Sequence, residues 1–100
     1  MKIITDKDRG RLTIAIEGQL GTASAKELED VLKANIGDAT ELVFDFEKLE
    51  YLASSGLRLL LASAKTMKKQ GSMKIIHVTK PVMNVLTFTG MVDIIDVEEI

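Results

Sequence analysis

The sequence predicts an α/β fold in which helices pack on a mixed β-sheet, and three observations support it. Apolar residues in the opening segments alternate with polar ones, which is the period of a strand with one buried face. A short connection joins these two segments and therefore implies an antiparallel pair. Further along, short apolar runs alternate with longer segments of helical spacing, so each strand–helix–strand unit should be parallel and right-handed. The predicted order of elements is β-β-α-β-α-β-α-β.

The composition is that of a globular protein, and it limits the classes of function. Of the 100 residues, 46% are hydrophobic and 28% are charged, which fits a single domain over residues 1–100. A net charge of −2 gives no electrostatic basis for a nucleic-acid partner. The absence of cysteine excludes a disulfide framework and a thiolate metal site.

The sequence also bears on the expected location of the protein. Its N-terminus lacks the apolar segment of a signal peptide. No apolar run approaches the roughly 20 residues that a membrane-spanning helix needs. We therefore expect a cytoplasmic protein that does not insert directly into a membrane.

The first strands are predicted from alternation and from glycine positions. Residues 2–6 form a short strand candidate, and residues 7–10 form a turn. Residues 12–17 alternate between apolar and polar side chains and are predicted to be a second strand. Residues 18–21 contain two glycines, which favour a loop that turns sharply.

The first helix is predicted over residues 22–36, because its apolar residues recur at helical spacing. Gly37 follows it as a C-terminal stop. Ser24 and Glu27 match a capping box at its start, although Thr22 is an alternative cap.

The middle of the chain joins a buried strand to a second helix. Residues 42–46 are apolar on both alternations except at Asp45, which suits a central strand covered on both sides. Asp45 either bonds nearby loop amides or approaches Ser54, and we favour the structural role because buried polar groups normally have partners. The helix is predicted from about Ser55 to Lys69. A serine at position 54 suits a helix N-cap, and the same place, rich in free amides, also favours a phosphate.

The second helix carries cations along its length. Arg58 lies in the first turn, where a cation opposes the helix dipole by about 0.3–1 kcal/mol. It is either an exposed side chain with good helix propensity or a contact to a partner or to a phosphate on Ser54. Lys65, Lys68 and Lys69 lie toward the C-terminal end and are expected to be solvated.

The last part of the chain is predicted to hold a strand, a helix and a final strand. Residues 73–78 form the first of these strands. Residues 79–81 open the helix, with Pro81 in the first turn, where its missing amide costs nothing. Gly90 ends the helix, and residues 92–97 form the last short strand.

Few side chains in the sequence suggest chemistry. The only histidine, His77, lies in a strand without a matched acid, and we expect it to serve packing. Met83, Phe88 and Met91 are expected in the core in preference to an apolar binding surface. There is no phosphate-binding glycine loop with lysine, no nucleophile elbow and no metal-ligand spacing. We therefore expect a protein without enzymatic activity, cofactor or metal.

Two sequence blocks resemble a known family. Residues 51–57, Tyr-Leu-Ala-Ser-Ser-Gly-Leu, resemble the signature of the STAS domain, the fold of bacterial anti-sigma factor antagonists. That signature is usually an aspartate or serine, a phosphorylatable serine, a small residue, glycine and leucine. Residues 18–23, Gly-Gln-Leu-Gly-Thr-Ala, resemble the family's glycine-polar-leucine-aspartate segment before its first helix. The similarity extends over about residues 3–95.

The resemblance implies a fold and a switching function. The fold is a STAS-like mixed sheet, with the usual C-terminal helix reduced or absent. In the family, the unphosphorylated antagonist binds an anti-sigma factor that is also its serine kinase, and so frees the sigma factor for transcription. Phosphorylation, here implied at Ser54, separates the complex, and a serine phosphatase resets it. The resemblance implies that the surrounding partner-binding residues are Gly21, Thr22, Ala53, Ser55, Gly56 and Arg58.

Two departures from the family pattern keep a second class of function open. Ala53 stands where an acid or serine is common, and Gly21 stands where the family often has aspartate. Both positions lie near the phosphorylation site in the family. The alternative is a constitutive STAS subunit of an ABC-type membrane transport assembly, which binds its ATPase without phosphorylation.

Overall fold

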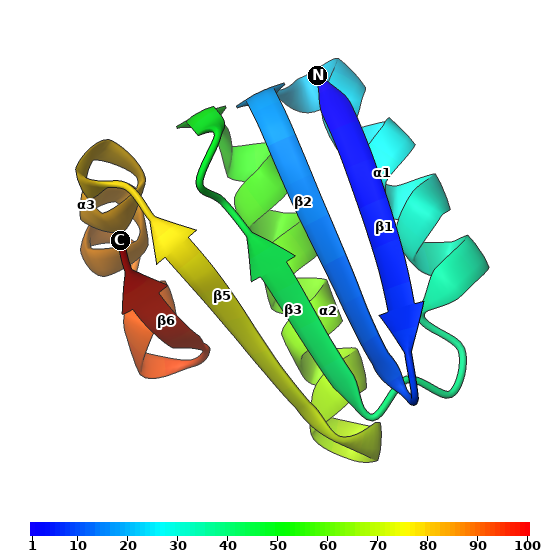
Figure 1. Cartoon of the computed structure of the whole chain (residues 1–100). Coiled ribbons are helices and arrows are strands. Elements are labelled where there is room, and N and C mark those ends of the chain that lie inside the picture. The colour runs from blue at the N-terminus through cyan, green and yellow to red at the C-terminus, as the bar shows by residue number, and fades with distance from the viewer.

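Helices cover one face of a six-stranded mixed sheet in the computed structural model, which describes residues 1–100. The sheet order is β1-β2-β3-β5-β6, with β4 paired to β2 off this path. β1 is antiparallel to β2, and the other pairs are parallel, as predicted. α1 and α2 lie on one side of the sheet, and α3 lies toward its β5–β6 end (Figure 1). The elements are β1 (Lys2–Asp8), β2 (Arg11–Leu20), α1 (Thr22–Asn35), β3 (Glu41–Asp45), β4 (Leu49–Leu52), α2 (Ser54–Gln70), β5 (Ser72–Val78), α3 (Lys80–Phe88), the 3₁₀ turn η1 (Met91–Asp93) and β6 (Asp96–Glu99).

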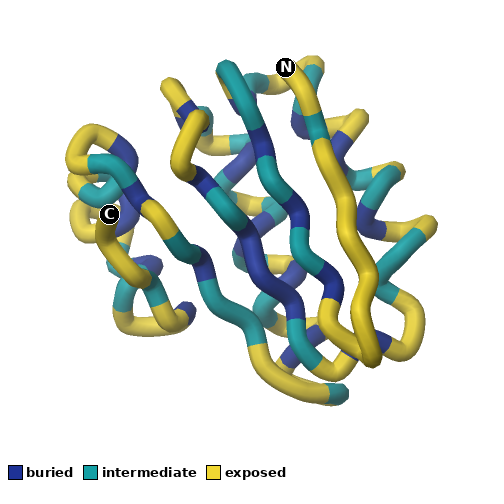
Figure 2. The backbone as a smooth tube through the Cα atoms, in the orientation of Figure 1, coloured by how far each residue is buried: buried dark blue, intermediate teal, exposed yellow.

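The core lies between the sheet and the helices. Along β2, Leu12, Ile14 and Ile16 are fully buried, whereas the side chains between them are partly exposed (Figure 2). This is the period-two burial that the sequence predicts. Phe44 and Phe46 add two buried rings with centroids 5.8 Å apart. One cluster of 21 buried residues joins these side chains, and it fixes the strand ends from which the helices begin.

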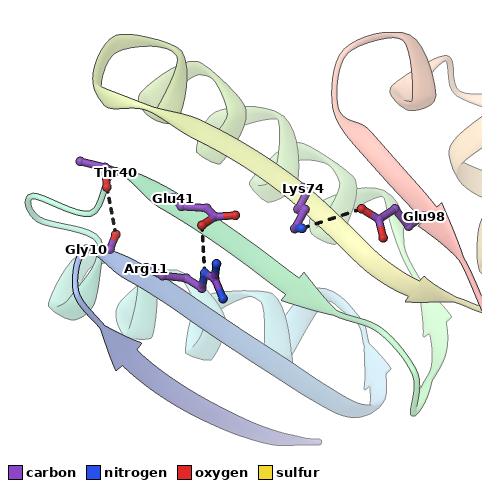
Figure 3. Close-up of polar contacts among 6 residues, drawn as sticks. All are labelled: Gly10, Arg11, Thr40, Glu41, Lys74 and Glu98. Atoms are coloured by element: carbon purple, nitrogen blue, oxygen red, sulfur yellow. Dashed lines mark hydrogen bonds and ion pairs between the residues drawn. The ribbon is translucent and has the colours of Figure 1, made fainter.

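The face of the sheet away from α1 and α2 carries ion pairs between neighbouring strands (Figure 3). Arg11 Nε donates to Glu41 Oε1 at 2.9 Å between β2 and β3. Lys74 Nζ lies 3.8 Å from Glu98 Oε2 between β5 and β6. Because these pairs are partly or largely exposed, each contributes at most about 1 kcal/mol, so stability comes mainly from the core.

The largest departure from the predicted order is strand β4, which the sequence reasoning missed. The predicted loop over residues 18–21 is wrong up to Leu20, because β2 continues to that residue and pairs with β4. Gly18 has φ +100° and lies where the register between the two strands shifts. Of the four residues of β4, only the first and last are buried. That pattern has no period of two, which is why alternation does not reveal the strand.

The start of α1 also differs from the predicted cap. The N-cap residue is Gly21, and Thr22 is the first helical residue. Ser24 occupies the third helical position, so the predicted capping box of Ser24 and Glu27 is wrong. The other end of the helix agrees with the prediction within one residue.

The C-terminal part confirms three predictions and corrects two. Pro81 lies in the first turn of α3, and Gly90, with φ +78°, follows the end of the helix. β6 begins later than the predicted start at residue 92, because η1 takes up the intervening chain. Phe88 is 92% exposed, so its predicted place in the core is wrong, whereas Met91 is buried. Phe88 is two residues after the buried Leu86 and so lies on the opposite side of α3, away from the core.

Candidate functional site at two helix N-termini

The parallel pairing of β2 and β4 brings the two sequence blocks together. Leu20 is the register partner of Leu52, and each is the last residue of its strand. The Ala53 N–H donates to the Leu20 carbonyl oxygen at 2.9 Å and continues the pairing by one residue. A helix begins directly after each strand, with Gly21 and Ala53 as the two N-cap residues. The first turns of α1 and α2 therefore meet at one edge of the sheet.

Ser54 is the first residue of α2, and its side chain is exposed. The N-cap is Ala53, which has extended backbone and no side-chain hydrogen bond, so the predicted capping role of Ser54 is wrong. The prediction that α2 begins within two residues of Ser55 is confirmed. The helix's first backbone bond runs from the Leu57 N–H to the Ala53 carbonyl oxygen at 3.1 Å. The amides before Leu57 have no partner in the helix, and they are available to water or to an anion.

The start of α1 has a side-chain hydrogen bond that the start of α2 lacks. Ser24 Oγ accepts a hydrogen bond from the Gly21 N–H at 2.8 Å and donates to the Gln19 carbonyl oxygen at 3.0 Å. Thr22 is exposed beside this cap. Neither N-cap residue bonds the first amides of its helix through a side chain, so both helix starts favour an anion, and Ser54 lies at the start of α2.

Gly56 sets how closely α2 approaches the strands. It is buried, and a Cβ placed on it would lie 2.8 Å from Leu52 Cδ1 and 2.9 Å from the Leu20 side chain. A larger residue would push the first turn away from β2 and β4. The glycine therefore positions the exposed Ser54 against the sheet edge.

Ser55 is more buried than Ser54. Its hydroxyl oxygen is inaccessible to solvent and has no hydrogen-bond partner. A buried hydroxyl without a partner is destabilising, because it gives up its bonds to water and gains none. Of the two adjacent serines, only Ser54 presents an accessible hydroxyl.

Ser55→Ala should therefore raise the free energy of unfolding by about 1 kcal/mol. The substitution removes an unpartnered polar group and leaves the exposed surface almost unchanged. Chemical denaturation of the two proteins measures the difference. Ser54→Ala is the matched control, and removal of its exposed hydroxyl should change stability by less than about 0.5 kcal/mol. A loss of stability in Ser55→Ala would mean that the hydroxyl is hydrogen-bonded in solution.

Arg58 follows one turn after Ser54 and is exposed. No carboxylate lies within ion-pair distance of it. Its guanidinium group is therefore free to contact a partner or a phosphate at the start of α2, and the alternative of a solvated side chain agrees equally with this position. Most of the implied partner-binding residues lie at the two helix starts, which the pairing of β2 and β4 brings together. Arg58 lies one turn further along α2.

A second polar cluster was not predicted. Asp45 Oδ1 accepts from the Glu47 N–H at 3.0 Å, which confirms the favoured loop-bonding role. The same oxygen lies 3.1 Å from His77 Nδ1, and Glu47 Oε1 lies 3.7 Å from that nitrogen. His77 is exposed and has φ +57°, so the prediction that it is a packing residue without an acid is wrong. Asp45 ends β3 and His77 lies near the end of the adjacent β5, a placement that could have indicated the pair.

Ser54 presents an accessible hydroxyl that could accept a transferred group. No hydrogen bond joins Ser54 to a histidine or a carboxylate. No three His, Cys, Asp or Glu side chains lie close enough together to hold a metal ion. None of the helices combines the length and apolar character that crossing a membrane would require. What the geometry provides is an exposed hydroxyl beside unpaired helix amides.

Comparison with known proteins gives consistent matches over nearly the whole chain. The family model described as "Mlab, STAS domain" matches residues 3–96. BtrV of Bordetella bronchiseptica, provisionally named an anti-sigma factor antagonist, is 31% identical over 97% of this chain and 85% of its own length. An anti-sigma factor antagonist from Mycobacterium paratuberculosis superposes with a TM-score of 0.88 at 20% identity, over 97% of this chain and 84% of that one. The Bacillus protein SpoIIAA in its phosphorylated form superposes with a TM-score of 0.77 at 19% identity, over 96% and 90%.

Proposed function

This chain belongs to the STAS domain family, and we propose that within it the protein is an anti-sigma factor antagonist switched by phosphorylation of Ser54. Unphosphorylated, it binds an anti-sigma factor with serine kinase activity and so frees a sigma factor for transcription. The kinase transfers phosphate to Ser54, the complex separates, and a serine phosphatase restores the binding form. The protein itself is an interaction module and not an enzyme.

The observation that carries the proposal is the position of Ser54. Its hydroxyl is exposed at the first position of α2, whereas the hydroxyl of Ser55 is buried. A kinase can therefore reach Ser54 without unfolding the helix. The names of the relatives support the partner class, and the phosphorylated form of SpoIIAA supports the modification in a protein of the same fold.

The proposed binding surface surrounds this serine. Gly21, Thr22 and Ala53 lie at the two adjacent helix starts, and Arg58 lies one turn along α2. Ser55 and Gly56 contribute through the backbone, because their side-chain positions face the strands. A partner that covers both helix starts would enclose Ser54 and remove water from around it.

Mapping of phosphate after incubation with the cognate kinase tests the proposed site. Phosphopeptide analysis should place the phosphate on Ser54, and Ser54→Ala should take up none. Ser55→Ala is the matched control and should be phosphorylated normally, since it leaves the accessible hydroxyl in place. Phosphate found only on Ser55, Thr22 or Ser24 would show that the motif has been assigned to the wrong residue.

A second candidate function has a specific observation in its favour. The N-cap positions beside Ser54 carry no acidic side chain, because they are Ala53 and Gly21. A constitutive subunit of an ABC-type transport assembly, bound to its ATPase, has no need of a phosphorylation site. Stable co-purification with a transporter ATPase, together with no phosphate uptake from any kinase encoded nearby, would favour this candidate over the first.

A further inference from the structure

A groove lies between α2 and η1, away from the helix N-termini. It has a volume of about 580 Å³. The C-terminal half of α2 forms one wall with Leu61 and Ala64, and Asp93 and Ile94 lie on the opposite side, so the only acid of the lining is away from α2. Met73, at the start of β5, also lines it. Ile94 is 57% exposed, so part of this apolar lining faces solvent.

The α2 wall of this groove is cationic. Four residues of α2 are basic and none is acidic, in a protein whose net charge is −2. Arg58, Lys65 and Lys68 recur with Leu61 at spacings of three or four residues, so they share one flank of the helix. None of these three cations makes an ion pair within the chain. The flank runs from the first turn of α2 to the groove, over about 15 Å.

We propose that this groove and the cationic flank of α2 form a second docking surface, which takes an amphipathic helix with acidic residues beside its apolar stripe. The apolar stripe lies over Leu61, Ala64 and Ile94, next to α2. Carboxylates on the side toward α2 meet Lys65 and Lys68. A helix fits this place because it continues the layer that α1 and α2 already form on the same face of the sheet (Figure 1).

The shape of the charge favours a helix over a single anionic headgroup. A headgroup is held by cations that converge on one point, whereas these cations lie in a line along α2. Carboxylates repeated every three or four residues on a helix match such a line.

The occupant is also not a second copy of this chain. α2 and α3 contain no acidic residue. The acids Glu29 and Asp30 of α1 are already within ion-pair distance of Lys26. Glu27 is then the only acid of an α-helix without an ion pair, and a single carboxylate does not make an acidic flank. The complementary helix therefore belongs to another protein.

A designed peptide tests the proposal directly. The probe is a helical peptide of about 18 residues, built from leucine, alanine and glutamate, with leucines on one stripe and glutamates on both flanks. The control peptide has lysine in place of every glutamate. Both are titrated into ¹⁵N-labelled full-length protein, and amide shifts locate the binding site. Dodecanoate is titrated in parallel, and sedimentation reports self-association.

The glutamate peptide should bind at least about tenfold more tightly than the lysine peptide, with shifts at Ala64, Met73 and Ile94. Lys65→Glu with Lys68→Glu should weaken binding by at least about tenfold, and salt should weaken it too. Lys2→Glu with Lys7→Glu makes the same change of net charge on β1 and should leave affinity unchanged. Ile94→Asp should weaken binding without lowering the melting temperature, because that side chain is already largely exposed.

Several results would overturn the proposal. Equal affinity for the two peptides would show that charge plays no part in binding. Amide shifts confined to other parts of the protein would show that the peptide does not bind in the groove. Binding of dodecanoate in the groove without binding of the peptide would assign it to a small amphiphile, and self-association that buries Ile94 would assign it to a second copy.

Discussion

Phosphorylation of Ser54 should weaken binding to the anti-sigma factor about a thousandfold, which corresponds to about 4 kcal/mol of binding free energy. The phosphate adds about 1.5 to 2 negative charges at a point that the partner would cover. An interface that fits the serine hydroxyl must then desolvate the phosphate without having been shaped for it. Titration of the purified partner against the two forms measures the loss.

The same modification should leave the fold intact. Ser54 is the first residue of α2, where unpaired amides and the positive end of the helix dipole favour an anion. The phosphorylated protein should therefore melt at the same temperature as the unmodified one, or higher. Ser54→Asp should behave likewise in stability and should weaken binding less than phosphate does, because it carries less charge. Ser54→Ala should retain partner binding, since no hydrogen bond depends on its hydroxyl.

Melting curves measured beside the titrations separate the possible outcomes. Equal affinity of the phosphorylated form, Ser54→Asp, Ser54→Ala and wild type would eliminate the switch and favour the constitutive subunit. Weaker binding together with an equally large loss of stability would mean that the modification acts on the fold.

Gly71→Ala should destabilise the protein by about 3 kcal/mol or more. A Cβ on this glycine would lie 1.9 Å from the carbonyl oxygen of Thr40, which is backbone and not a flexible side chain. That carbonyl cannot easily withdraw, because it accepts the Ser72 N–H at 3.0 Å. Gly71 is itself tied to the end of α2 by its N–H, which donates to the Met67 carbonyl oxygen at 2.7 Å. The added methyl must therefore separate α2 and β5 from the segment before β3.

Gly37→Ala is the matched control for this prediction. It is also a glycine just beyond a helix, yet a Cβ placed there meets nothing within 4 Å. Its stability should stay within about 0.5 kcal/mol of wild type, or rise slightly through the lower entropy of the unfolded chain. Urea denaturation of the three proteins provides the comparison. Similar losses in both variants would show that the contact with Thr40 does not limit stability.

Much of the fold is predictable because the local patterns agree with one another. Alternation locates β2, a doubly apolar run locates β3, and helical spacing with a following glycine locates α1 and α3. The choice of Ser54 over Ser55 comes from the resemblance of residues 51–57 to the STAS signature, and the exposure of Ser54 agrees with it.

Three of the features that escaped prediction depend on long-range pairing. β4 is too short to be recognised and its burial has no period of two, so only its partner β2 makes it a strand. Serine is a good N-cap in general, yet here the pairing of Ala53 with Leu20 fixes the cap one residue earlier. The contact between Asp45 and His77 exists only because β3 and β5 are neighbours in the sheet. Local propensity carries no information on any of these contacts.

The close packing of Gly56 against Leu20 and Leu52 has a consequence for how long a phosphorylated state would last. Because the first turn of α2 lies close to two strands, phosphate on Ser54 would act through its own charge at the surface and not through a rearrangement of the domain. The lifetime of the phosphorylated state would then be set by the enzymes that form and hydrolyse the phosphate ester, independently of thermal motions in the domain. Partners could bind and dissociate many times within that lifetime, and each would meet the same phosphorylated surface.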